Sequence, residues 1–236
     1  YFFTVLFTFP LMLFFFKKYL VWTDKPKLQL IRGLILLTAN ISFFYSISVI
    51  SLPKALTLAF VAPLVVTAFS PFFLGESVGY RRWTAVIIGF IGSLVVIRPG
   101  FVEINLASLA ALGTGIMYGF YLIITRKLST SDNPLLTLLL TGVVGAIIAT
   151  TFMPFVWVSP TFNQWSIMAA IGLFACIGHL FIILSLKYAD ASKLAPFSYF
   201  EIVTNIIIAY YFFGDFPDSW TFLGLFIIVF SGIYLS

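Results

Sequence analysis

The sequence predicts an all-α polytopic membrane protein, organised as an inverted repeat of two five-helix halves. Three observations predict this class. Hydrophobic residues make up 61% of the chain and charged residues only 9%, whereas a soluble domain has about 25% charged residues. Apolar stretches of helical length recur along the chain, and its two parts share one register of helices and loops. Composition alone therefore excludes a soluble domain.

Nine apolar stretches are expected to form transmembrane helices. A helix needs about 20 mainly apolar residues to cross a bilayer. The expected helices cover approximately residues 1–16, 28–49, 53–74, 80–98, 104–126, 133–157, 164–187, 191–213 and 217–235. Short turns such as Ser51-Leu52-Pro53 and Phe216-Pro217-Asp218 separate them. Such connections leave no room for a domain outside the membrane.

Lysine and arginine are distributed unevenly between alternate loops, and this distribution sets the orientation of a membrane protein. If the loop after the first helix is cytoplasmic, the opposite side carries only Lys54 and Arg98. The cytoplasmic side then carries Lys17, Lys18, Lys25, Lys27, Arg32, Arg81, Arg82, Arg126, Lys127, Lys187 and Lys193. This bias predicts that the C-terminus is cytoplasmic.

A shift of 139 residues aligns the second part of the chain with the first, because it places Gly75 on Gly214. It also places Asn40 on His179, so that two polar residues inside apolar stretches coincide. Other pairs in this register are Gly33 with Gly172 and Ala85 with Gly224. We therefore interpret the chain as an internal repeat.

The repeat is expected to be inverted, because a unit with an odd number of spans re-enters the membrane in the opposite direction. The four lysines of loop 17–27 agree, since the corresponding loop 157–165 has none. Inverted repeats recur in secondary transporters, with the binding site near the midplane. We expect the first repeat at residues 1–100 and the second at 101–236. The helix at 104–126 has no first-repeat counterpart, so the first of ten helices is expected to be missing.

Short motifs follow one another in a characteristic order. In the first half they are Arg32-Gly33-Leu34, Ser51-Leu52-Pro53-Lys54-Ala55, Val61-Ala62-Pro63-Leu64, Leu74-Gly75-Glu76, Arg82-Trp83 and Gly89-Phe90-Ile91-Gly92. In the second half they are Ala195-Pro196-Phe197-Ser198-Tyr199-Phe200-Glu201 and Phe213-Gly214-Asp215. This order resembles the EamA-type permeases of the drug/metabolite transporter superfamily over essentially the whole chain.

The resemblance implies ten helices in two inverted repeats, a central cavity, and transport of small organic metabolites without ATP hydrolysis. The substrates of the family are often amino acids or their derivatives, and a bacterial inner membrane is the implied location. The stretch before Glu201 and the turn at Phe216-Pro217-Asp218 look most like the branch containing bacterial S-adenosylmethionine carriers. Ile202 departs from the family pattern, which often has proline after this glutamate.

Glu201 is the principal candidate for binding substrate, because it lies near the middle of an apolar stretch. An ionisable residue at that depth is costly and normally faces a partner or a water-filled cavity. Ser198 and Asn205 share its helical face, three residues before and four residues after it. We expect a buried Glu201 that binds a substrate ammonium or carries the coupling proton. The alternative is a structural hydrogen bond to a neighbouring helix.

The other candidate binding residues are the polar and aromatic residues inside the spans. His179 is expected either to pair with Glu201 or to serve as a packing residue, and Asn40 is its repeat counterpart. The candidate tyrosines are Tyr45, Tyr118, Tyr121 and Tyr199. They are expected either to line the cavity, where a phenol can stack on a ligand or bond to it, or simply to pack.

Small residues and prolines are expected to shape the helices. The ladder of Ala111, Gly115 and Gly119 and the pair Gly89 and Ser93 allow close approach of helices and are interpreted as packing seams. Pro63 and Pro196 each free a backbone carbonyl, which creates a hinge or a ligand acceptor unless a neighbour satisfies it.

The sequence lacks the motifs typical of enzymes, nucleotide-hydrolysing proteins and channels. The chain has one histidine and one cysteine, with no His-Glu-x-x-His motif and no phosphate-binding loop, so we expect no catalytic residue, metal or cofactor. An intramembrane enzyme is the alternative of a different class, but it lacks a second carboxylate opposite Glu201. A channel usually shows polar rings from symmetric subunits. The expected partners are a small-molecule substrate, lipid and a coupling proton or counter-substrate, in a monomer or homodimer that binds no nucleic acid.

Overall fold

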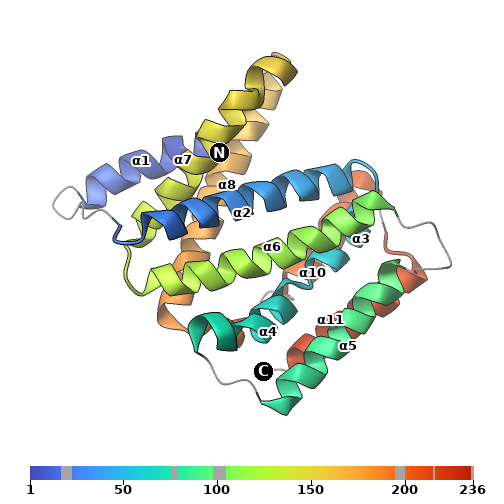
Figure 1. Cartoon of the computed structure of the whole chain (residues 1–236). Coiled ribbons are helices and arrows are strands. Elements are labelled where there is room, and N and C mark those ends of the chain that lie inside the picture. Colours follow the sequence, from blue (N-terminus) through green and yellow to red (C-terminus); the bar gives the residue numbers. More distant parts are fainter. Residues whose placement is uncertain (17–22, 76–78, 98–104, 195–199, 215, 235–236) are drawn as a thin grey trace. The chain divides into compact units, whose positions relative to one another are not determined.

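The computed structural model describes residues 1–16, 23–75, 79–97, 105–194, 200–214 and 216–234, and all regular structure within them is α-helical (Figure 1). The helices are α1 (Phe2–Phe16), α2 (Pro26–Ile47), α3 (Leu52–Ala59), α4 (Ala62–Leu74), α5 (Tyr80–Ile97), α6 (Leu106–Ser129), α7 (Pro134–Val156), α8 (Phe162–Tyr188), α9 (Ala191–Leu194), α10 (Phe200–Phe213) and α11 (Ser219–Tyr234). The all-helical class is thereby confirmed.

Each of the nine predicted stretches contains at least one of these helices. Five segments are long and apolar enough to cross a membrane: Pro26–Ile47, Leu52–Leu74, Leu106–Ser129, Pro134–Val156 and Phe162–Tyr188. The other predicted spans contain shorter apolar helices within the residues that the structure describes. The positions of the helices therefore agree with the sequence, while the number of spans stays a prediction.

Local chemistry sets several helix ends. Asn133 begins α7, since its side-chain oxygen accepts the backbone N–H of Leu135 at 2.9 Å, and Pro134 follows in the first turn. Gly75 and Gly214 follow α4 and α10 with φ of 71° and 70°. This left-handed conformation is strained for a residue with a Cβ and commonly ends helices. The two glycines are the pair aligned by the sequence repeat.

The chain divides into two compact units. Unit 1 comprises residues 1–37 and 124–188, and unit 2 comprises residues 38–123 and 189–236. Each unit therefore takes segments from both predicted repeats, so packing and sequence symmetry divide the chain differently. The repeat boundary near residue 100 describes sequence symmetry and stays a prediction.

In unit 1, glycines allow α1 to pack closely against α7 and α8. A Cβ added at Gly142 would lie 2.9 Å from the Val5 side chain, and one at Gly145 would lie 2.3 Å from the Tyr1 ring. The later residue of α7, Gly145, meets the earlier residue of the N-terminal segment, Tyr1, so the two helices run antiparallel. Gly172 of α8 similarly faces Phe3, with 2.3 Å between the added Cβ and the Phe3 Cβ.

In unit 2, α5 and α11 lie side by side and antiparallel (Figure 1). A Cβ added at Gly224 would lie 2.7 Å from the Gly92 carbonyl oxygen, and one at Gly89 would lie 2.8 Å from the Ser231 hydroxyl. Ser93 is fully buried on the same helix and donates to the Gly89 carbonyl at 3.3 Å. The predicted packing seam at Gly89 and Ser93 is therefore confirmed.

The second small-residue ladder brings α6 against α3 and α4. A Cβ added at Gly115 would lie 2.4 Å from the Ala59 carbonyl oxygen, and one at Gly119 would lie 2.7 Å from the Val65 Cβ. Ala111 is fully buried in a cluster with Ala55, Leu58 and Val96. This ladder is also a packing seam, as predicted, because the backbones approach too closely for larger residues.

Gly115→Ala should destabilise the protein by about 1–3 kcal/mol, because the new methyl group overlaps a backbone carbonyl that cannot rotate away. Gly113→Ala is the matched control, since its added Cβ would meet nothing closer than 3.9 Å. The control should be neutral or gain about 0.5–1 kcal/mol from helix propensity. Thermal unfolding in detergent measures both variants, and equal stability for the two would contradict this account of the seam.

Candidate functional site

The helix that fills residues 52–74 is interrupted in its middle. α3 ends at Ala59, and Phe60 departs from helical geometry with φ of −68° and ψ of 5°. α4 begins at Ala62 with Pro63 in its first turn. Proline has no backbone N–H, so Pro63 cannot donate to the carbonyl of Ala59 four residues earlier. The predicted effect of Pro63 is therefore present as a break between two helices.

Gly115 covers the carbonyl that this break frees. Its Cα faces the Ala59 oxygen so closely that a Cβ would lie 2.4 Å from that oxygen. A backbone carbonyl at membrane depth needs a neighbour that satisfies or shields it. The packing seam and the helix break therefore depend on each other.

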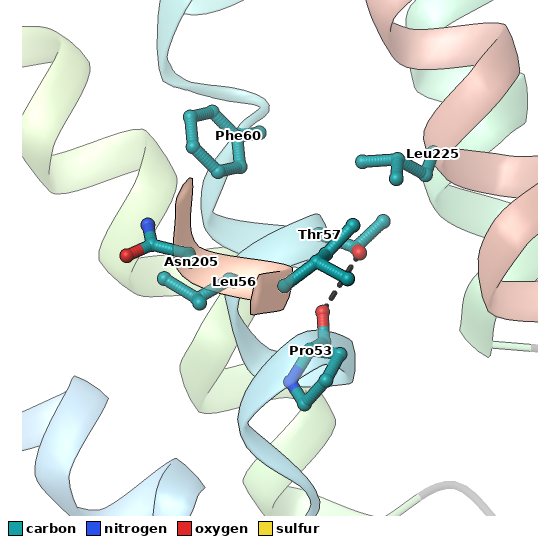
Figure 2. Close-up of a pocket in the computed structure, with 7 residues that line it drawn as sticks. Pro53, Leu56, Thr57, Phe60, Asn205 and Leu225 are labelled. Atoms are coloured by element: carbon teal, nitrogen blue, oxygen red, sulfur yellow. Dashed lines mark hydrogen bonds between the residues drawn. The ribbon is translucent and has the colours of Figure 1, made fainter. Parts of the chain in front are cut away.

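A pocket opens beside the break, and its lining comes entirely from unit 2 (Figure 2). Its lining residues are Pro53, Leu56, Thr57, Phe60, Asn205, Ile206 and Leu225. The Thr57 hydroxyl donates to the Pro53 carbonyl at 2.8 Å, so its proton is already used. Asn205 brings an amide to walls that are otherwise largely apolar. The space inside it is about 10 Å³, far below the roughly 300–1,000 Å³ of a typical ligand site and about the room that one water molecule needs.

Asn205 links this pocket to Glu201. Its side-chain nitrogen donates to the Glu201 carboxylate at 3.4 Å, which confirms that the two residues share one face of α10. Glu201 lies in the first turn of the helix, where the helix dipole favours an acidic side chain. Its side chain is exposed, however, and this corrects the expectation of a buried acid. A carboxylate that remains accessible can bind a cationic group beside the Asn205 amide.

Two further candidates lie on neighbouring segments of unit 2. Thr114 of α6 donates to the Ala39 carbonyl of α2 at 3.3 Å, which places Asn40 beside α6. Tyr118 lies one turn beyond Thr114 and stacks on the buried Tyr121, with ring centroids 5.5 Å apart. Asn40 and Tyr118 are both half-buried, so each retains accessible surface.

The remaining candidates are one exposed tyrosine, one residue of unit 1 and two residues outside those that the structure describes. Tyr45 is exposed near the end of α2. His179 is half-buried in α8 of unit 1, so its pairing with Glu201 of unit 2 stays a prediction. Ser198 and Tyr199 lie outside the described residues, as does Pro196.

Sequence reasoning missed Phe60 and Thr57, which line the pocket from the α3 side. A signal was available, because Phe60 lies three residues before Pro63 and therefore in the turn that a proline disrupts. Both residue types are common in apolar helices, however, and only the approach of α10 distinguishes them from lipid-facing residues.

Comparison with known proteins gives a consistent set of similarities. The model of the EamA-like transporter family matches residues 1–98 and 105–236. The S-adenosylmethionine uptake transporter of Rickettsia bellii is 26% identical over 221 residues, covering 94% of this chain and 76% of that protein. The riboflavin transporter of Vibrio cholerae is 29% identical over 189 residues, covering 78% and 62%. The Pseudopaline exporter CntI of Pseudomonas aeruginosa is 26% identical over 212 residues, covering 88% and 74%.

A solved crystal structure superposes on this chain with a TM-score of 0.72 at 18% sequence identity. The superposition covers 99% of this chain and 84% of the other. At this identity the likeness shows a shared fold.

Pro63→Ala should join α3 and α4 by returning the donor to the Ala59 carbonyl. A restored backbone hydrogen bond predicts about two- to ten-fold slower amide exchange across residues 60–64. Pro71→Ala is the matched control, since Pro71 also lies inside α4 but away from the break. Hydrogen exchange with mass spectrometry measures both variants. Unchanged exchange at residues 60–64 in Pro63→Ala would show that Pro63 does not cause the break.

Proposed function

This chain belongs to the EamA-like transporter family, and on that premise we propose that it is a secondary carrier of a small organic metabolite in the bacterial inner membrane. Membership of the family makes the chain a multi-pass membrane transporter and not an enzyme. The proposed substrate is an amino acid or an amino-acid derivative. The alternative is S-adenosylmethionine or another metabolite of nucleoside or vitamin type, because relatives are named for S-adenosylmethionine and riboflavin.

The proposed architecture is the inverted repeat, with residues 1–100 and 101–236 as its two parts. Gly75 and Gly214, which the repeat aligns, share one unusual backbone conformation at the ends of α4 and α10. The antiparallel pair of α5 and α11 also supports it, since inversion makes repeat-related helices run in opposite directions. Two such halves allow alternating access around a site near the midplane.

The proposed orientation places the C-terminus in the cytoplasm. Segments assigned to the cytoplasmic side, two of them loops and two of them helix ends, contact one another in unit 1. Lys25 donates to the Ser131 hydroxyl at 3.3 Å, and Arg126 donates to the Leu186 carbonyl at 2.5 Å. These contacts support the assignment of alternate loops to the same side of the membrane, because segments on opposite faces of a membrane cannot touch.

The helix break that opens on the Asn205 pocket is the observation that carries the proposed mechanism. Discontinuous helices in secondary transporters expose backbone groups and helix ends to the substrate. We propose that the metabolite binds where Asn205 borders this pocket, and that the neighbouring Glu201 binds its ammonium group or carries the coupling proton. Asn40, Tyr45 and Tyr118 are proposed to complete the site from unit 2. His179, Ser198 and Tyr199 remain further candidates from the sequence.

Glu201→Gln should lower the initial rate of transport about ten- to a hundred-fold, the loss expected for a charge-assisted contact. The measurement is saturable uptake into proteoliposomes that contain the full-length protein and no ATP. Asp24→Asn is the matched control, since it removes an exposed carboxylate outside the site. Wild-type flux from Glu201→Gln across the pH range would remove Glu201 from the mechanism, and flux that never saturates would indicate a channel.

A substrate that binds the native state should raise the melting temperature of the purified protein. At a hundred times its Kd, a ligand stabilises the native state by about 2.7 kcal/mol. Separate additions of amino acids, S-adenosylmethionine and riboflavin distinguish the proposed substrate class from its alternatives. Asn205→Leu should reduce the shift caused by the true ligand, whereas an equal shift in this variant would place the ligand elsewhere.

A further inference from the structure

Unit 1 contains a cluster of buried polar side chains that the proposed site does not use. Its members, here called the polar latch, are Thr23, Gln29, Arg32, Thr125, Asp132, Thr137 and Thr141. Each is at most 8% exposed, and Arg32 is fully enclosed. Buried polar side chains in an apolar protein are costly unless they bond to one another, so a cluster of this size requires an explanation.

Arg32 joins α2 to α6 and α7. Its Nε donates to the Thr125 hydroxyl at 2.7 Å, and its Nη1 donates to the Thr137 carbonyl at 3.1 Å. Nη1 also donates to the Thr141 hydroxyl. A guanidinium within an apolar span is stable only where such acceptors surround it. These bonds therefore set the position of the N-terminal half of α2.

Asp132 joins the same end of α2 to the turn between α6 and α7. Its Oδ2 accepts the Thr23 hydroxyl at 2.5 Å and the Gln29 amide nitrogen at 2.8 Å. The same nitrogen donates to the Thr137 hydroxyl at 3.0 Å. The Gln29 Oε1 is buried without a hydrogen-bond partner among the described residues. The junction therefore contains the Asp132 carboxylate oxygen, which accepts two hydrogen bonds, and the Gln29 carbonyl oxygen, which accepts none from the described residues.

The latch joins residues of the two proposed repeats within unit 1. Thr23, Gln29 and Arg32 belong to the first repeat, and the other members belong to the second. The repeat shift of 139 residues places Met168 and Ile171 at the positions of Gln29 and Arg32, and both are exposed apolar residues of α8. No equivalent cluster can therefore form from these positions of the second repeat.

Hydrogen-bonded contacts separate differently from apolar seams. A polar side chain that leaves its partner can bond to water instead, so each hydrogen bond contributes only about 0.5–1.5 kcal/mol of net stability, or about 1.5–3 kcal/mol where a charged group takes part. The glycine seam between α1 and α7 has no such compensation, because its groups are apolar. Thr23 and Gln29 lie near the start of α2 and Asp132 lies in the turn before α7, so this part of the junction is at helix ends, and hydrogen bonds there suit contacts that must break and reform.

We propose that the polar latch closes the predicted cytoplasmic end of unit 1 and opens during each transport cycle. This inference rests on the proposed function, since it assigns the latch to one step of alternating access. It identifies Gln29 and Asp132 as positioning residues, which act by holding α2 against the turn between α6 and α7 and not by contacting substrate.

A reversible cross-link beside the latch tests whether it opens. Lys25→Cys with Ser131→Cys, made in a Cys176→Ser background, places two thiols at a junction where the native side chains lie 3.3 Å apart. The full-length protein is reconstituted, treated with a reducible bifunctional thiol reagent, and assayed with S-adenosylmethionine and riboflavin as probes. Transport should fall at least about ten-fold and return on reduction, as expected when a gating motion is blocked.

The control pair is Thr161→Cys with Gln164→Cys, which joins exposed neighbours at the start of α8. Its cross-link should leave transport unchanged, because it ties no two helices together. Normal transport by the protein cross-linked at positions 25 and 131 would overturn the latch.

Labelling of a buried reporter tests the latch without transport. Ser129→Cys in the same background replaces a side chain that is 1% exposed on the latched turn. Gln29→Leu removes two hydrogen bonds and should raise the rate of labelling by a water-soluble maleimide at least about ten-fold. Asp132→Asn should raise it less, since an amide oxygen still accepts, and Asp24→Asn should leave it unchanged.

The two measurements separate the latch from the proposed function. If the wild-type protein transports neither S-adenosylmethionine nor riboflavin, these substrates are rejected. The labelling rate of Ser129→Cys then tests the latch by itself. Unchanged labelling in both Gln29→Leu and Asp132→Asn would overturn the latch whatever the transport result.

Discussion

A backbone carbonyl within a membrane must find a donor or a close covering neighbour, and this constraint organises unit 2. Pro63 removes the donor of the Ala59 carbonyl, and Gly115 covers that carbonyl because it has no Cβ. The break then turns Phe60 away from the regular helix, beside the α10 residue Asn205. One missing N–H thus accounts for the broken helix, the need for a glycine on α6 and the position of the pocket.

Both units contain glycine seams, and unit 1 adds a cluster of buried hydrogen bonds. In unit 2, glycine seams bring backbones so close that no extra methyl group fits between Gly92 and Gly224. In unit 1, a glycine seam joins α1 to α7, but the end of α2 is held by hydrogen bonds from Arg32 and to Asp132. Apolar seams have no alternative partner in water, whereas each hydrogen bond that separates can be replaced by one to water.

Spacing along one helix predicted part of the candidate site. Glu201 and Asn205 lie four residues apart, so a helix places them on one face, and the hydrogen bond between them follows from that geometry. Spacing could not predict that Glu201 would be exposed, since exposure depends on neighbouring helices. It also could not predict Phe60, because an aromatic residue before a proline becomes part of a pocket only when another helix approaches it.

Hydropathy was enough to predict the membrane class and the helix positions, and the 139-residue shift aligned Gly75 with Gly214, which share a left-handed backbone conformation. These properties depend on neighbouring or regularly spaced residues, so they can be recognised in the sequence without knowledge of the three-dimensional fold. The meeting of Gln29 with Asp132, 103 residues apart, is not of this kind. Only the tertiary structure decides such contacts, because a buried polar residue can be satisfied by many partners and the fold selects which one is near.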